Sequence, residues 1–179
     1  DSAVKNAMYD NIGRIYTIAQ VHEQLYSSEN LAEVDLSRYI TSLIAYLLSI
    51  EKYANFHVHT DIRIERVLLN VNQAIPLGLI IFELVSNSMQ HSFKDKDDGL
   101  IRVICRQEDQ KLSLEVGDNG LTFDPQLFQS VETVGFSIIQ ELIHQLGGSM
   151  NYEHYEGNLF KIIFPLMPLQ DGDLEEASV

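Results

Sequence analysis

The run from Pro76 to His91 constrains the fold of this chain more than any other segment. It is an apolar stretch with helical periodicity that nevertheless carries Glu83, Asn87 and His91 at successive four-residue intervals. Side chains four residues apart lie on the same face of an α-helix, so these polar groups are predicted to form one stripe. Because an unpaired polar group is costly to bury, the stripe must meet water, a ligand or a metal ion.

A second polar signal follows this helix in the sequence. The segment Val116–Gly120 reads Val-Gly-Asp-Asn-Gly and comes directly after a strand-like run. Taken alone, the polar stripe is typical of a solvent-facing helix edge, and Asp118-Asn119-Gly120 is typical of a plain turn. Their joint occurrence favours a nucleotide site.

Composition narrows the classes of partner. The 179 residues suit one full domain and part of a second. A net charge of −14 with scattered Lys and Arg residues argues against a nucleic-acid surface. An acidic protein can still bind ATP through helix N-termini, backbone amides and Mg²⁺.

The sequence also indicates the redox environment of the chain and whether it contacts a membrane. The single cysteine, Cys105, excludes an internal disulfide, and its place in the run Ile101–Arg106 favours a buried strand residue over a reactive thiol. No apolar run approaches the ~20 residues of a membrane span, and the N-terminus lacks a signal-peptide pattern. We expect a soluble segment without membrane contact.

Two helices are predicted at the N-terminal end. The first covers residues 4–27, with apolar-face positions at three- and four-residue steps, namely Ile12, Ile15, Ile18, Ala19, His22, Leu25 and Tyr26. The second begins after an N-cap at Asp35 and ends near Tyr53. Joined by a short loop, the two should pack antiparallel.

The remainder alternates between strands and helices. Short strands are predicted at 56–62, 67–70, 100–106, 111–116, 149–154 and 159–165. Helices are predicted at 73–93 and at 134–146, the latter ending at the C-cap signal Gly147-Gly148. This pattern predicts an α+β class: a two-layer α/β sandwich with a mixed sheet faced by about three helices, preceded by an N-terminal α-helical segment.

The long polar-striped helix carries a family resemblance. Residues Ala74–Leu79 (Ala-Ile-Pro-Leu-Gly-Leu) and Glu83–Ser88 (Glu-Leu-Val-Ser-Asn-Ser), with His91 and Phe93, resemble the N box of sensor histidine kinases. The resemblance implies the Bergerat-type ATP-binding fold.

Three further segments resemble the same family. Asp118–Gly120 is similar to the first glycine box, and Val134–Ile139 with Gln145–Gly148 is similar to the second. Val21–Tyr26 (Val-His-Glu-Gln-Leu-Tyr) resembles the second dimerisation helix of one subfamily. The boxes occur in the family's order across roughly residues 10–166.

The resemblance implies roles for individual residues. Glu83 would orient or activate the attacking group, and Asn87 would bind Mg²⁺ that bridges the triphosphate. Asp118 would accept a hydrogen bond from the adenine amino group, which discriminates against guanine. Gly120 would let the backbone approach the base, and Gly135 would let a helix start close to the phosphates.

Two more positions belong to the implied nucleotide site, and two depart from the family pattern. Asn158 stands where relatives often have a Thr near the adenine, and His91 completes the N box. Thr122 replaces a glycine, and Gln90 replaces a lysine that often reaches the phosphates. Of the second glycine box only Gly135 is retained.

The implied function is the ATP-binding catalytic core of a cytoplasmic sensor histidine kinase, with ATP and Mg²⁺ as cofactors. It would pass the γ-phosphoryl group to a histidine, serve a response regulator and form a homodimer in the parent protein. Residues 1–55 would be part of the helical dimerisation and phosphotransfer segment, 56–168 the catalytic domain, and 169–179 an acidic disordered tail.

Alternatives stay open at this point. Thr122 and Gln90 favour a degenerate adaptor that docks a response regulator without ATP turnover. A gyrase-like or chaperone-like ATPase is a third reading, which the helices before residue 55 oppose. The phosphoacceptor motif of the subfamily is absent, so the chain resembles a kinase without its first helix. His22-Glu23 superficially resembles an acceptor site, but the position of His22 favours a place in the helix-packing seam.

Overall fold

The computed structural model describes residues 2–27, 33–50, 57–93, 98–121, 134–154 and 156–169. The elements follow the predicted order, with two additions: the short strand β1 and a π-helical turn labelled η2. They are α1 (Ser2–Ser27), β1 (Glu33–Asp35), α2 (Leu36–Ser49), β2 (His57–Ile64), β3 (Leu68–Asn70), α3 (Val71–Asn87), η2 (Ser88–Ser92), β4 (Asp98–Glu108), β5 (Lys111–Asp118), α4 (Val134–Gln145), β6 (Ser149–His154) and β7 (Asn158–Pro165).

Five strands form the main sheet in the order β2-β4-β5-β7-β6. β2 runs parallel to β4 and the other neighbours are antiparallel, so the sheet is mixed as predicted. Side chains alternate between the two faces along each strand, so one set points inward. Val103, Val116 and Phe160 lie in register on three adjacent strands, and all are buried. A separate antiparallel pair, β1 with β3, lies at the base of α2 and α3.

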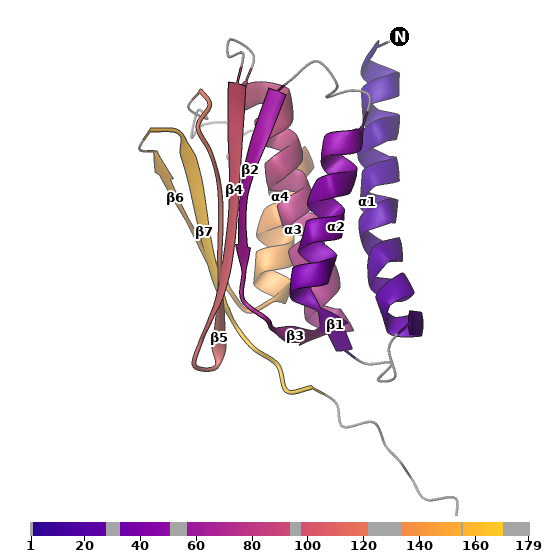
Figure 1. Ribbon diagram of the computed structural model, residues 1–179, viewed down its shortest axis with the longest axis vertical. Coiled ribbons are helices and arrows are strands. Elements are labelled where there is room, and N and C mark those ends of the chain that lie inside the picture. The colour runs from indigo at the N-terminus through magenta and orange to yellow at the C-terminus, as the bar shows by residue number, and fades with distance from the viewer. Residues whose placement is uncertain are drawn as a thin grey trace, which may run out of the picture.

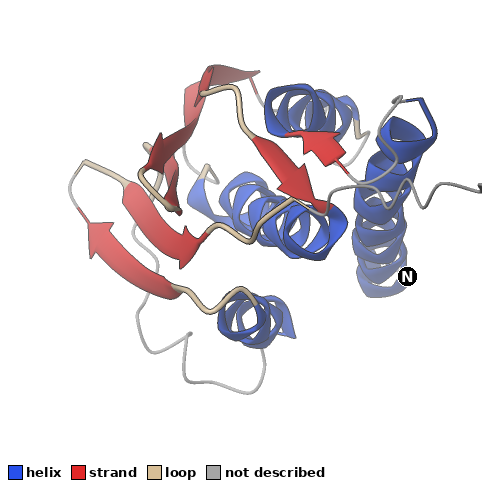
Figure 2. Cartoon of the chain, turned by 90° about the horizontal axis from the view of Figure 1, so that it is seen from below, coloured by secondary structure: helices blue, strands red, loops and turns tan. Residues whose placement is uncertain are grey.

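Helices α2, α3 and α4 cover one face of this sheet, and α1 lies outside them (Figures 1 and 2). The two-layer α+β architecture is therefore confirmed. α3 occupies the centre, between the sheet and α1, and this explains why its sequence is apolar on nearly every side. No helix among the described residues is both long and apolar enough to cross a membrane.

Helix boundaries follow local capping chemistry. Asp35 caps α2 as predicted, accepting a hydrogen bond from the Arg38 backbone N–H at 3.1 Å. α2 ends at Ser49, earlier than the predicted end near Tyr53, which lies outside the described residues. α3 begins two residues before the predicted Gln73, because Asn70 serves as its N-cap and accepts from the Gln73 N–H at 3.1 Å.

The predicted packing face of α1 is wrong. Within this chain α1 docks onto α3 and α2 by a face that includes Gly13, Thr17 and Val21. Its apolar stripe is exposed instead, and the exposed members include Val4, Met8, Ile12, Ile15, Ile18 and Tyr26. The physical reason is steric: small residues let two helix backbones approach closely, which a row of isoleucines would prevent.

His22 follows the stripe and is also exposed, so its expected place in a packing seam is not found within this chain. α1 and α2 do run in opposite directions, as predicted, with Tyr16 stacked on Tyr46 at 3.7 Å between ring centroids. Cys105 is buried in β4, as expected, and burial raises the pKa of its thiol to about 12. The predicted tail lies outside the described residues except for Leu169.

Candidate functional site

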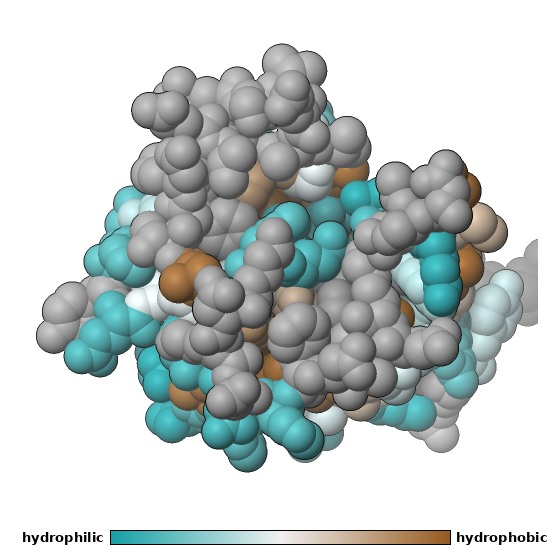
Figure 3. Space-filling model, turned by 90° about the horizontal axis from the view of Figure 1, so that it is seen from above, coloured by the Kyte–Doolittle hydropathy of each residue, from teal (hydrophilic) through white to brown (hydrophobic). Residues whose placement is uncertain are grey.

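The sequence-predicted polar residues meet at one end of the molecule, the upper end in Figure 1. There α3 passes into η2, β5 ends at Asp118 and β7 begins at Asn158. Seen from above, the described residues that are visible at this end include hydrophilic and hydrophobic ones side by side (Figure 3).

The centre of the site is the carboxylate of Asp118, which is 7% exposed. Its Oδ1 accepts from the Gly120 N–H at 2.8 Å and from Asn158 Nδ2 at 2.9 Å. Its Oδ2 accepts from Ser88 Oγ at 2.6 Å and from Ser92 Oγ at 3.2 Å. A carboxylate offers about four lone-pair positions, so these four donors hold the ionised group in one orientation.

The sequence reasoning did not identify Ser88 and Ser92 as part of the site. The feature of the sequence that could have identified them is a pair of small hydroxyl residues four positions apart, each directly following a residue of the polar stripe. Both lie in the π-helical turn η2, a local widening of the helix that recurs at functional sites. The same turn carries His91, which is exposed while Glu83 is buried, so the three-residue stripe runs from the interior to the surface.

Position 120 requires a glycine because its backbone lies very close to Ser92. A Cβ on this residue would overlap both the side chain and the backbone carbonyl of Ser92. The turn is held there by the Leu121 N–H, which donates to the Ser92 carbonyl at 2.9 Å. Asn119 fixes the other side, accepting from the Leu100 N–H at 2.8 Å. Thr122 lies outside the described residues.

Asn158 joins this network from the last strand. Its Nδ2 reaches the Leu121 carbonyl at 2.8 Å as well as Asp118, and its Oδ1 accepts from the Tyr152 hydroxyl at 2.8 Å. Asn158 therefore lies beside Asp118, supported by both β6 and β7.

Glu83 and Asn87 lie deeper, one helical turn apart on α3. Glu83 is 4% exposed, and its Oε1 accepts from Arg14 Nε at 2.6 Å. The hydrogen bond from Arg14 to Glu83 raises the pKa of the guanidinium above its already high ordinary value. Gly135, in the first turn of α4, stands beside the other oxygen: a Cβ there would lie 2.9 Å from Glu83 Oε2 and 3.8 Å from Asn87 Nδ2. Arg14 was missed by sequence reasoning, because nothing along the chain relates it to Glu83.

Asn87 has an unsatisfied donor. Its Nδ2 is buried and has no hydrogen-bond partner among the described residues, as is also true of Ser86 Oγ. An unpaired buried amide costs on the order of 1–3 kcal/mol, so such groups are explained best by a ligand that completes them.

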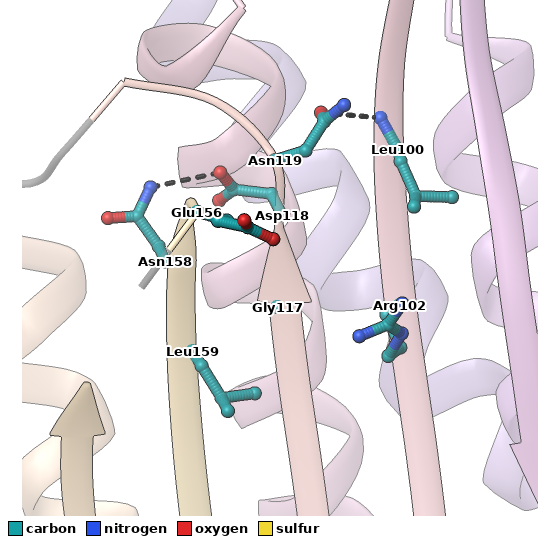
Figure 4. A pocket seen from close by; sticks show the side chains of 8 residues that line it. All are labelled: Leu100, Arg102, Gly117, Asp118, Asn119, Glu156, Asn158 and Leu159. Atoms are coloured by element: carbon teal, nitrogen blue, oxygen red, sulfur yellow. Dashed lines mark hydrogen bonds between the residues drawn. The ribbon is translucent and has the colours of Figure 1, made fainter. Parts of the chain in front are cut away.

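A cavity of about 220 Å³ adjoins Asp118 on the other side of the sheet (Figure 4). Its walls come mainly from outward-facing positions of β4, β5 and β7, and it is lined by Leu100, Arg102, Gly117, Asp118, Asn119, Glu156, Asn158 and Leu159. It includes neither Glu83 nor Asn87. We therefore place the candidate site on the α3 side of Asp118, where the orphaned amide lies, and not in this hollow.

The comparisons with known proteins define the class. The family described as histidine kinase-, DNA gyrase B-, and HSP90-like ATPase matches residues 72–168, and a family described as histidine kinase matches residues 1–51. The chain belongs to the histidine kinase-, DNA gyrase B-, and HSP90-like ATPase family.

Its relatives by sequence are kinases. The chain is 26% identical over 153 residues to the sensor histidine kinase PdtaS of Mycolicibacterium smegmatis, covering 82% of this chain and 30% of the relative. A 48-residue stretch is 42% identical to the serine-protein kinase RsbW of Listeria monocytogenes, covering 27% of this chain and 31% of the relative. The chain thus spans about a third of the length of the curated relatives it matches.

Solved structures share the fold. The histidine kinase domain of the Erythrobacter litoralis EL346 blue-light-activated histidine kinase superposes with a TM-score of 0.78 at 18% identity, over 88% of this chain and 75% of that one. ShkA, solved in complex with AMPPNP, gives a TM-score of 0.61 at 15% identity, over 88% and 36%. Together these findings confirm an ATP-binding domain of the histidine kinase type and do not favour the adaptor alternative.

Proposed function

We propose that this chain is the ATP-binding catalytic part of a cytoplasmic sensor histidine kinase, which transfers the γ-phosphoryl group of ATP to a histidine. The observation that carries the proposal is the pairing of two features, one at the end of β5 and one at the end of α3. Asp118 is a buried carboxylate held by four donors, and Asn87 has a buried Nδ2 that finds no hydrogen-bond partner in the described part of the chain.

The residue roles follow the chemistry of each group. Asp118 accepts the exocyclic amino group of adenine, because a guanine would present a carbonyl oxygen to a carboxylate. Ser88 can make room for that amino group, since its hydroxyl lies 3.1 Å from the Leu84 carbonyl and can donate there instead. Gly120 and Asn158 complete the base-binding side.

The phosphate side is assigned to α3 and the start of α4. Asn87 Nδ2 suits a phosphate oxygen, its Oδ1 suits Mg²⁺, and Gly135 leaves space at the α4 N-terminus, where backbone N–H groups favour anions. When bound, Mg²⁺ neutralises phosphate charge. Glu83 acts as the base or orienting group for the attacking histidine, and His91 contributes to nucleotide binding at the rim.

The helical segment supports an assembly. We assign residues 1–55 to dimerisation and 56–168 to catalysis, with a response regulator as the downstream partner. The exposed stripe on α1 supports a homodimer in the parent protein: exposed apolar residues grouped along one helix mark a contact surface.

Nucleotide titration tests the site. Calorimetry should show ATP and ADP binding in preference to GTP, with Mg²⁺ strengthening the triphosphate. Asp118→Ala should remove most of this binding, whereas Asp98→Ala, an exposed aspartate at the start of β4, should leave it unchanged. Equal affinity for ATP and GTP in the wild type contradicts the assignment of Asp118.

A labelling experiment separates kinase from adaptor. The proposed acceptor histidine is not among these 179 residues, so the chain alone should not label itself with radioactive ATP, and the parent protein should. Acid-labile phosphate on this chain that disappears in His22→Gln contradicts the acceptor assignment. Tight ATP binding without transfer to any supplied histidine helix favours the adaptor.

A further inference from the structure

The contact between α1 and α3 occupies the proposed catalytic carboxylate. Arg14 Nε lies 2.6 Å from Glu83 Oε1, with side-chain exposures of 26% and 6%. The guanidinium is also held in place from its own helix, since Arg14 Nη1 donates to Asn11 Oδ1 at 3.2 Å. Charge-assisted hydrogen bonds of this length are among the stronger polar contacts in proteins.

The opposite side of the carboxylate faces the start of α4. Gly135 stands so near Glu83 Oε2 that a Cβ would lie 2.9 Å from it. One oxygen therefore faces a cation and the other faces the first turn of α4. A general base must place an oxygen within hydrogen-bond reach of the proton it removes, and in this arrangement Arg14 occupies Oε1 of Glu83.

Helices α1 and α3 pack closely around this ion pair, which fixes the position of one along the other. A Cβ on Gly13 would overlap the ring of Phe82, the residue before Glu83, so the two helices are in closest contact next to Arg14. The Tyr39 hydroxyl donates to the Thr17 carbonyl at 3.1 Å, fixing α1 from the α2 side. A shift of α1 along its axis would consequently carry Arg14 away from Glu83.

The docked face is also the less apolar face of α1. It presents Gly13, Thr17 and Arg14 to α3. At the rim, Gln90 Nε2 donates to Asp10 Oδ1 at 3.4 Å. The isoleucine stripe stays exposed. A helix that binds through small and polar residues buries less apolar surface and is easier to release.

We infer that Arg14 is a positioning residue that acts as a latch: it holds Glu83 unavailable while α1 is docked, and movement of α1 releases the carboxylate for phosphoryl transfer. The inference rests on the proposed function, because it assigns regulation to Glu83 of that site. A signal can then control phosphoryl transfer by a physical route, because any displacement of α1 removes Arg14 from the Glu83 carboxylate.

The test compares three variants in the full-length parent protein, measuring autophosphorylation against ATP concentration. Arg14→Gln removes the cation but keeps hydrogen-bonding capacity, and it should raise kcat about tenfold with KM for ATP unchanged. Arg14→Lys keeps the charge and should return kcat toward the wild-type value. Lys5→Gln makes the same charge change on an exposed part of α1 and should match the wild type.

Thermal melts of each variant accompany the kinetics. A lower kcat in Arg14→Gln, or equal rates in Arg14→Gln and wild type, overturns the latch whether or not stability changes. If Arg14→Gln melts too early to assay, Asn11→Ala loosens the guanidinium without removing it and should raise kcat by a smaller factor; an unchanged kcat there also overturns the latch. A wild type that binds no ATP in calorimetry refutes the proposed function instead, so the two failures are distinguishable.

Discussion

Helices α1 and α3 lie against each other, yet they depart from the usual distribution of polarity in opposite ways. α3 is buried on nearly every side and still carries the buried side chain of Glu83 and the buried Nδ2 of Asn87. α1 is a surface helix and still leaves Ile12 and Ile15 exposed, at 51% and 67%. Each departure is costly without a partner, and the two costs point to partners of different kinds.

For α3 the missing partner is small and charged, because the unsatisfied group is a hydrogen-bond donor beside a helix N-terminus. For α1 it is large and apolar, because the exposed residues form a stripe along the helix. The comparison teaches that an unpaired polar group inside and an exposed apolar stripe outside follow the same rule, since the described part of the chain supplies a partner to neither.

The largest expected effect belongs to the interior of α3. Glu83→Gln keeps the shape of the side chain but removes its basicity, so phosphoryl transfer in the parent protein should fall by about 10²–10⁴-fold while ATP affinity stays within a factor of about three. Rates from radioactive ATP and affinities from calorimetry measure the two quantities. Equal loss of both would mean that Glu83 serves binding or stability and not catalysis.

A matched pair on α1 tests whether its two faces differ. Val21→Glu places an unpaired charge at a fully buried position and should lower the free energy of unfolding by about 3 kcal/mol or more. Ile15→Glu makes the same change at an exposed position and should alter it by less than about 0.5 kcal/mol. Urea denaturation of both variants measures the difference.

The same pair bears on assembly. Ile15→Glu should weaken self-association of the parent protein in sedimentation experiments, because it places a charge in the stripe. Strong destabilisation of the monomer by Ile15→Glu would show that the stripe is buried after all.

Gly13→Ala tests how closely α1 must approach α3. The added methyl group overlaps the Phe82 ring, so the helices must separate, at a cost of about 1–3 kcal/mol. Hydrogen exchange of α1 amides should accelerate while the amides of β5 keep their protection. Glu23→Ala, at an exposed position of α1, is the control, and equal exchange in all three proteins would contradict the tight contact.

Ser88→Ala should give the smallest effect. Asp118 keeps three of its four donors, so the free energy of unfolding should fall by about 1 kcal/mol. ATP affinity should change by less than tenfold, because the adenine amino group can take the vacated position. A collapse of ATP binding in this variant would assign Ser88 a direct contact with the base.

Many of the residues that gather at this site could be predicted from their spacing along the chain. The four-residue steps of Glu83 and Asn87, and the turn at Asp118, identified which polar residues would gather, because helical periodicity and turn chemistry are local properties. The bounds of the six predicted strands agree with β2 to β7 to within two residues for the same reason, and β1 was not predicted. The residue roles themselves remain proposals.

The sequence by itself determined the α+β class, the N-cap at Asp35 and the burial of Cys105, since each depends on a few neighbouring residues. Only the tertiary structure decided which face of α1 would be buried, and that Arg14 would meet Glu83 across 69 positions of sequence. It also decided that Ser88 and Ser92 would meet the carboxylate of Asp118. These outcomes depend on how closely two backbones can approach, and that distance is set jointly by both partners of a contact, so periodicity along one helix cannot encode it.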